Sequence, residues 1–145
     1  MTNVLFHGSS TLVEGALNPM PSRVVDGERV VFATNKRWIA LLNIVRFTGA
    51  DLEYGYDEDG AAYIKEMYHD AFVKIALQGT GYLYTVSAEG FGGDERLGMP
   101  GSEFISRSAA PIIATEEIEL VHLAILEDDE CVMFHEYESD SDDSD

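Results

Sequence analysis

The sequence predicts an α+β domain with a mixed or antiparallel β-sheet and with helices mainly in its N-terminal half. Three observations predict this class. Short segments rich in β-branched and aromatic residues recur along the whole chain. Two segments of the first half place apolar residues at helical spacing, and glycine-rich or proline-rich stretches separate the segments from one another. We therefore expect residues 1–136 to form a single domain.

The first part of the chain predicts two strands followed by a helix. Residues 3–7 and 29–33 have the composition of strands, and the stretch 11–28 between them is expected to be a loop because it holds several glycines and prolines. Asn35 is the expected N-cap of an amphipathic helix over residues 36–47, where apolar residues recur every three to four positions.

The rest of the chain predicts one further helix and then mainly strands. An acidic, glycine-rich loop over 49–60 precedes the expected helix at 61–78, although its second half, AFVKIAL, is also compatible with an extended strand. The period then changes from helical to alternating. A glycine-rich loop is expected within EGFGGDERLGMPG. Strands are expected in GYLYTVSA, EFIS, IIA, IELVHLAIL and CVMFHEY.

Composition and charge limit the classes of function. The 145 residues include 9 basic and 27 acidic side chains, for a net charge of −18, which argues against direct binding to nucleic acid or to an anionic membrane. We expect neither a signal peptide nor a membrane span, because no long apolar run occurs. A single cysteine, Cys131, excludes an internal disulfide and a cysteine-based zinc site. We expect a monomeric, cytoplasmic protein.

The last residues of the chain form a separate segment. They read HEYESDSDDSD, and such a run of serine and acidic residues cannot bury enough apolar surface to become ordered. We therefore expect residues 137–145 to be a disordered tail. Its charge favours solubility through self-repulsion, with mimicry of nucleic acid as the alternative.

One short motif carries most of the functional signal. The stretch VLFHGSS ends an expected strand in His7, Gly8, Ser9 and Ser10. A glycine lets a ligand approach the backbone closely, and imidazole and hydroxyl groups offer directional hydrogen bonds to a polar molecule. The alternative is a simple strand end at which Ser10 caps a turn.

This motif resembles the first signature of the ADP-ribosyltransferase superfamily, whose poly-ADP-ribose polymerase branch begins with a strand ending in His-Gly-Ser or His-Gly-Thr. VVFAT, at residues 30–34, is similar to the second signature of that branch, Tyr-Phe-Ala or Tyr-Phe-Ser before a helix. The segments 79–101 and 104–112 resemble the small rifamycin-modifying ADP-ribosyltransferases. The resemblance spans about residues 4–125 and implies an ADP-ribosyltransferase-like fold.

The resemblance implies an enzyme of the glycosyltransferase class with NAD as co-substrate. It would cleave the bond between nicotinamide and ribose and transfer ADP-ribose to a protein or small-molecule acceptor. Because the transition state has oxocarbenium character, the site must hold NAD and place negative charge nearby. By resemblance, His7 would bind a ribose hydroxyl and Gly8 would bind the nicotinamide carboxamide through its backbone. Ser9 or Ser10 would hold the neighbouring ribose.

The second motif departs from the family pattern. Val31 stands where the family carries a tyrosine that stacks on nicotinamide, and Phe32 next to it is expected to face the other side of the strand. Val31 cannot stack, so another aromatic residue covers the ring, or NAD binds weakly, or catalysis has been lost. Trp38, Tyr54 and Tyr56 are the candidates, although Trp38 also fits the apolar stripe of a core helix.

Two acids are candidates for the catalytic carboxylate. Asp94 lies in the loop where the rifamycin-modifying enzymes carry an aspartate, and Glu103 resembles the glutamate of the Asn-Glu-Tyr-Ile type strand in the polymerase branch. We slightly favour Glu103, because a strand fixes its position better than a glycine-rich loop fixes Asp94. The alternative is that neither acid is catalytic.

Other kinds of site have less support. His69, His122 and His135 show no metal-ligand spacing, so no metal site is expected. No Gly-x-Ser-x-Gly motif indicates a hydrolase. The sequence thus predicts an ADP-ribosyltransferase that uses NAD. The alternative is a catalytically inactive binding or inhibitor protein on the same fold, which uses its acidic surface against a basic partner.

Overall fold

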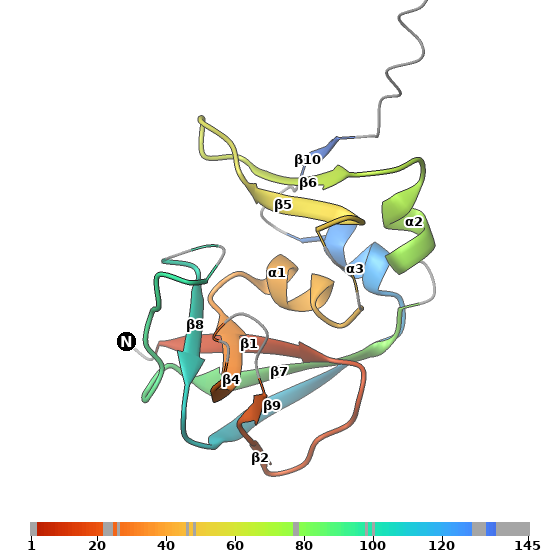
Figure 1. The fold of residues 1–145 in the computed structure, drawn as a ribbon. Helices are drawn as coiled ribbons and strands as arrows, with labels where there is room; N and C mark the ends of the chain where they lie inside the picture. Colours follow the sequence, from red (N-terminus) through yellow and green to blue (C-terminus); the bar gives the residue numbers. More distant parts are fainter. Residues whose placement is uncertain are drawn as a thin grey trace, which may run out of the picture.

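The computed structural model describes residues 3–21, 25, 27–45, 47, 49–76, 79–97, 99, 101–128 and 133–135. These residues form an α+β fold, as the sequence predicts, with mostly antiparallel strands. A large sheet and a small sheet lie on opposite sides of a layer of short helices (Figure 1). Cys131 and the tail predicted at 137–145 lie outside the described residues.

The large sheet is curled, and all of its strand pairs among the described residues are antiparallel. It consists of β1 (Val4–Ser9), β2 (Ala16–Leu17), β3 (Met20–Pro21), β4 (Arg29–Thr34), β7 (Gly81–Ser87), β8 (Glu103–Ser106) and β9 (Ala110–Ile118). The order is β2-β9-β7-β1-β4-β3, and β8 pairs with β4 beside that path. The strand that carries His7 is therefore central, with a partner on each side.

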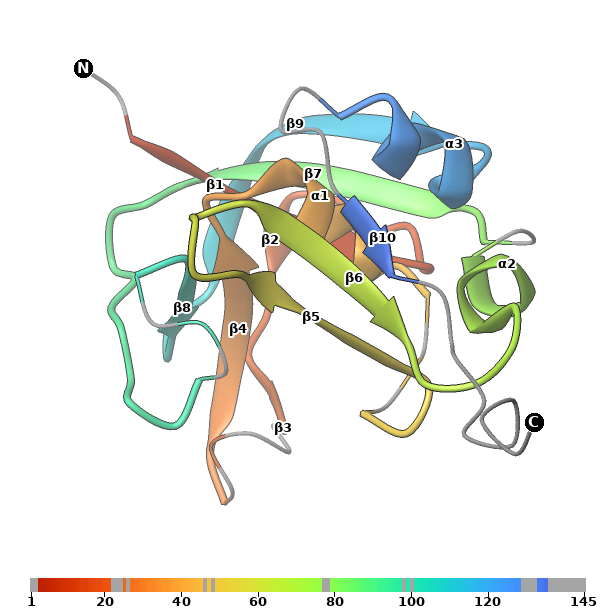
Figure 2. The ribbon, with the colours of Figure 1, turned by 90° about the horizontal axis from the view of Figure 1, so that it is seen from above.

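The small sheet contains β5 (Leu52–Tyr56), β6 (Ala62–Glu66) and β10 (Met133–His135). β5 and β6 form an antiparallel hairpin, and β10 runs parallel to β6. In the turned view of Figure 2 this sheet lies across the helix layer.

The small sheet corrects two predictions. Residues 49–60 were expected to be a loop, but they contain β5. Residues 61–78 were expected to be a helix, but their first part contains β6; the helix is confirmed only in their second half, as α2 (Ala71–Ala76). The reason is an alternation that the acidic and glycine residues conceal: Ala62, Ile64 and Glu66 are buried while the residues between them are more exposed.

The helices are α1 (Arg37–Leu42), α2 (Ala71–Ala76) and α3 (Val121–Leu126). α1 lies between the two sheets, and residues 38–42 are all buried. It is shorter than predicted, and its N-cap is Lys36 rather than Asn35. No side chain of the described residues caps the helix, and the Thr34 hydroxyl oxygen accepts the Lys36 backbone N–H at 3.1 Å in the turn that leads into it. Among the described residues, no helix has the length and apolar character needed to cross a membrane.

The position of α3 corrects a further prediction, because IELVHLAIL was expected to be a strand. Val121 and Ile125 are the buried residues of α3, and their spacing of four is that of a helix packed on one face. The β-branched residues of this stretch favoured the wrong element. Since α3 lies near the C-terminal end, the prediction that helices occur mainly in the N-terminal half is not confirmed.

Candidate ligand-binding site

A pocket with a volume of about 480 Å³ opens on one face of the large sheet, near the end of β1. Polar groups and apolar side chains share its wall. The lining residues are His7, Ser9, Thr11, Val13, Leu17, Asn18, Met20, Pro21, Val30, Val31 and Phe32. Strands β1 and β4 thus bring together four of the residues that the sequence predicted as ligand contacts, namely His7, Ser9, Val31 and Phe32.

Gly8 belongs to the opposite face, because neighbouring residues of a strand point to opposite sides of the sheet. A Cβ atom at Gly8 would overlap the backbone carbonyl oxygen of Ala40 in α1. The close approach that glycine permits is therefore made by a helix of the same chain. Ser10 is exposed and does not line the pocket.

The His7 ring is held in one orientation by its neighbour strand. Its Nδ1 lies 2.5 Å from the Phe32 carbonyl oxygen, and because a carbonyl can only accept, Nδ1 must carry the hydrogen. Burial lowers the pKa of His7 and outweighs the opposing effect of this hydrogen bond. A neutral His7 in this tautomer leaves Nε2 as a hydrogen-bond acceptor.

Tyr84 of β7 positions the rim of the pocket. Its hydroxyl accepts the Val13 backbone N–H at 2.6 Å and donates to the Thr11 carbonyl at 2.9 Å. The Thr11 N–H in turn donates to Ser9 Oγ at 3.1 Å. The His7 and Tyr84 rings also lie 6.3 Å apart between centroids. Sequence analysis missed this role, although a tyrosine in an alternating strand needs a hydroxyl partner when buried.

The predicted replacements for the missing stacking tyrosine lie elsewhere. Val31 is 2% exposed and contributes no ring to the pocket. Trp38 is fully buried in α1, with the Tyr54 and Tyr56 rings at centroid distances of 5.8 and 6.0 Å. These three residues belong to the interface between α1 and the small sheet, and none of them lines the pocket.

Glu103 lies on the same sheet face as Gly8. It pairs with Thr34 across β8 and β4, and only 2% of its surface is exposed. Its Oε2 accepts the Tyr54 hydroxyl at 2.6 Å, and its Oε1 accepts the Met99 backbone N–H at 2.9 Å. Burial, together with this bond to Glu103, raises the pKa of Tyr54. The carboxylate is thus enclosed by the small sheet and the preceding loop, and it does not line the pocket.

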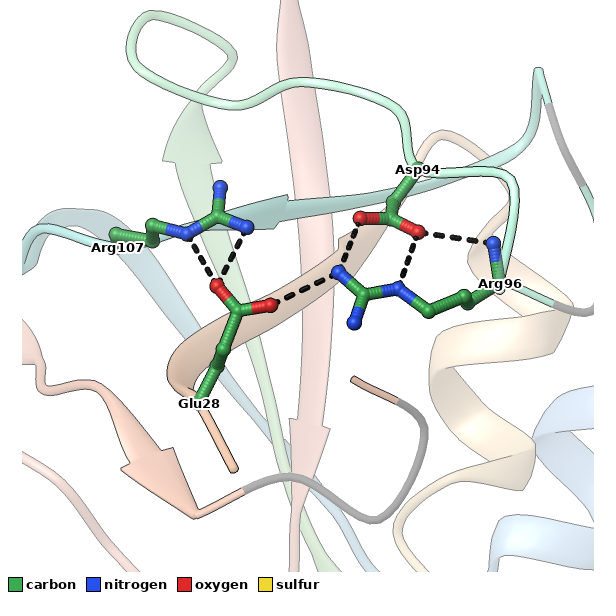
Figure 3. Close-up of polar contacts among 4 residues, drawn as sticks. All are labelled: Glu28, Asp94, Arg96 and Arg107. Atoms are coloured by element: carbon green, nitrogen blue, oxygen red, sulfur yellow. Dashed lines mark hydrogen bonds and ion pairs between the residues drawn. The ribbon is translucent and has the colours of Figure 1, made fainter. Parts of the chain in front are cut away.

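Asp94 is part of an ion network on the surface, which Figure 3 shows. Its carboxylate accepts the Arg96 side chain at 2.7 and 2.9 Å and the Arg96 backbone N–H at 2.8 Å. Glu28 joins Arg96 to Arg107 through contacts of 2.8 and 2.6 Å. Hydrogen bonds from Arg96 lower the pKa of Asp94. The network connects the glycine-rich loop to residues beside β4 and β8, and Asp94 does not line the pocket.

The lining of the pocket suits part of an NAD molecule. His7 Nε2, the Ser9 and Thr11 hydroxyls and the Asn18 amide can bind ribose hydroxyls or a base edge, while apolar walls can cover a flat ring. No Lys or Arg is among the described lining residues. The residues therefore fit a nucleoside portion of NAD.

Among the described residues, no group of three or more His, Cys, Asp or Glu side chains lies so that it could hold a metal ion. No protein-family model, curated protein or solved structure matches the chain.

Proposed function

We propose that this chain is an ADP-ribosyltransferase of the poly-ADP-ribose polymerase-like type, which binds NAD in the pocket at His7. One observation carries the proposal: residues that the sequence resemblance assigns to NAD converge on one pocket from two strands. His7 and Ser9 come from β1, and Val31 and Phe32 come from β4. When bound, NAD supplies the ribose carbon from which nicotinamide departs, and a protein or small-molecule acceptor receives the ADP-ribose.

The residues of the chain bind and orient the nucleoside. His7 is fixed by the Phe32 carbonyl, so its Nε2 can accept a hydrogen bond from a ribose hydroxyl. The Ser9 hydroxyl can donate to a neighbouring oxygen, because its own acceptor position already holds the Thr11 N–H. Rigid placement of the reacting group lowers the entropic part of the barrier.

The transfer step needs negative charge near the developing cation. Glu103 is the preferred acid by resemblance, but its carboxylate lies on the other face of the sheet, bound to Tyr54 and Met99. Asp94 is the alternative, and Arg96 already neutralises it. Either acid would have to leave its partners to reach the ribose. The geometry therefore supports binding of NAD more directly than it supports transfer.

The experiment measures nicotinamide release from NAD by the purified chain, with and without a cell lysate as the source of acceptor. His7→Ala and Glu103→Gln are the test variants, and Glu89→Gln is the control because Glu89 is exposed and outside the pocket. Release that both test variants abolish, with the control unchanged, supports the transferase. Absence of release from the unmodified protein under both conditions rejects it.

A second candidate function is a catalytically inactive binding or inhibitor protein on the same fold. The observation that favours it is that no carboxylate is among the described lining residues, while Glu103 and Asp94 are both engaged in internal hydrogen bonds. This reading predicts no nicotinamide release and binding of a basic partner that weakens steeply with salt. His7→Ala should leave that binding unchanged. The monomeric state and the cytoplasmic location remain predictions under both readings.

A further inference from the structure

A second hollow, with a volume of about 500 Å³, lies between the end of β9 and α3. It shares no lining residue with the His7 pocket. Its lining residues are Arg37, Glu116, Glu117, Ile118, Glu119, Leu120, Leu123, Ala124 and Glu127. The surface formed by these residues is called the α3 surface below.

Two leucines give the α3 surface an apolar strip. Leu120 and Leu123 are 45% and 40% exposed. Leu123 belongs to α3, and Leu120 is the extended N-cap residue directly before the helix. Val121 and Ile125 are buried on the inner side. Helix α3 therefore carries apolar side chains on its exposed side as well as on the side that packs into the core. A single exposed leucine is common on protein surfaces, and here two of them line the same hollow.

Acidic side chains surround this apolar strip. Glu117, Glu119 and Glu127 are exposed, and none of them forms an ion pair with a Lys or Arg of the described residues. Arg37 is the one basic residue among the described lining residues, and its guanidinium is bound to both oxygens of Glu116 at 2.8 Å. The three remaining carboxylates therefore give the hollow a strong negative potential.

We propose that the α3 surface docks a basic, partly apolar segment of another protein. Its apolar side chains would cover Leu120 and Leu123, while its Lys or Arg residues would pair with the surrounding glutamates. Charge complementarity selects this occupant. A second copy of this chain, with its net charge of −18, would bring like charges together, as would a nucleic acid. This proposal goes beyond NAD chemistry and does not depend on it, so either can fail while the other stands.

The test measures binding of a synthetic helical peptide with lysines on one face and leucines on the other, by fluorescence anisotropy at low and physiological salt. The same peptide with serines in place of leucines is the peptide control. One variant is Leu120→Ser with Leu123→Ser, and Leu12→Ser is its control, since Leu12 is also exposed. A second variant carries glutamine at Glu117, Glu119 and Glu127, and its control carries glutamine at the exposed residues Glu14, Glu58 and Glu89.

We expect the leucine variant to raise the Kd by about tenfold or more, as loss of a central apolar contact does. The glutamine variant should raise the Kd several-fold at low salt and less at high salt, because salt screens exposed charges. The serine peptide should bind no better to the unmodified protein than to the leucine variant. The proposal is rejected if the lysine-leucine peptide does not bind, or if control variants lose as much affinity as the α3 variants.

Discussion

The two faces of the large sheet around β1 and β4 differ in what they leave open. On one face, His7 and Val31 border a pocket of about 480 Å³. On the other face, Gly8 contacts α1, and Glu103 is enclosed with both oxygens bonded to the same chain. These faces are made by alternating residues of the same two or three strands, so each residue and its neighbour have different environments.

The face with His7 and Val31 is called the open face, and the face with Gly8 and Glu103 is called the closed face. The open face can bind a ligand, whereas the closed face supports the fold. On the open face, His7 and Ser9 line the pocket, whereas both carboxyl oxygens of Glu103 on the closed face already accept hydrogen bonds. A buried carboxylate with two donors is stable without a ligand. The resemblance assigns residues of both faces to one site, and only variants that treat the faces separately can establish whether they act together.

The largest effect on the free energy of unfolding is expected at Gly8, which packs against α1 on the closed face. Gly8→Ala should lower the free energy of unfolding by about 3 kcal/mol or more, because the new methyl group would overlap the Ala40 carbonyl, which belongs to the backbone and cannot rotate away. Urea denaturation followed by circular dichroism measures the loss. Gly93→Ala is the control, since a Cβ atom there would meet nothing within 4 Å. Equal free energies of unfolding for the two variants would contradict the close contact between Gly8 and α1.

The next effect concerns Glu103 itself. Glu103→Ala should cost about 2–3 kcal/mol of folding free energy, because the Tyr54 hydroxyl and the Met99 N–H would lose their acceptor in a buried place. Tyr54→Phe should cost less, about 1–2 kcal/mol, since only one of the two bonds is lost. Thermal and urea denaturation measure both. If Glu103→Gln keeps full stability but abolishes nicotinamide release, the carboxylate acts in catalysis rather than in the closed face.

The pH dependence of stability tests the burial of His7 on the open face. Burial lowers the pKa of His7 below its ordinary value of 6.5. The unfolded chain then binds more protons than the folded chain as the pH falls below about 6.5, so this group makes the protein less stable there. The stability lost between about pH 7 and pH 5 should be smaller in His7→Asn, which retains a donor for Phe32 but does not titrate. Identical pH profiles for both proteins would contradict the burial of His7.

The smallest effect belongs to the exposed ion network in Figure 3. Arg96→Gln should lower stability slightly, and the difference should shrink as salt is added, because exposed ion pairs are weak and screened. Arg96 lowers the pKa of Asp94, so the contribution is present above the ordinary carboxyl pKa and is lost as the pH falls through the folded value. Melting temperatures at two salt concentrations and two pH values measure this. A large, salt-independent loss would indicate that the network does more than fix the loop.

The sequence predicted elements well where pattern and composition agreed. Strands β1, β4, β7 and β8 were expected at nearly their observed positions because β-branched and aromatic residues cluster there. The sequence predicted the wrong element where local composition and tertiary packing disagreed. Glycine and acids made β5 look like a loop, and β-branched residues concealed the helical spacing of α3.

The candidate site was predictable only in part for a related reason. The resemblance of two short motifs to one family brought His7 and Val31 into one hypothesis, and both line the pocket. The face on which Glu103 lies depends on the register with which β8 pairs with β4, and no local pattern encodes that register. The role of Tyr84 likewise depends on a hydrogen bond to a segment about seventy residues earlier in the chain.

The pairing of β1 with β4 and β7 has a consequence for how the chain folds during synthesis. Phe6 pairs with Thr34 of β4 and with Thr85 of β7, whereas the local hairpin of β5 and β6 joins Tyr56 to Ala62. Because long loops must close before such distant pairs form, folding is expected to be slow, on the order of milliseconds to seconds. β1 emerges from the ribosome long before β7 and has an unpaired edge until then. An N-terminal fragment that stops before Gly81 should therefore aggregate rather than fold.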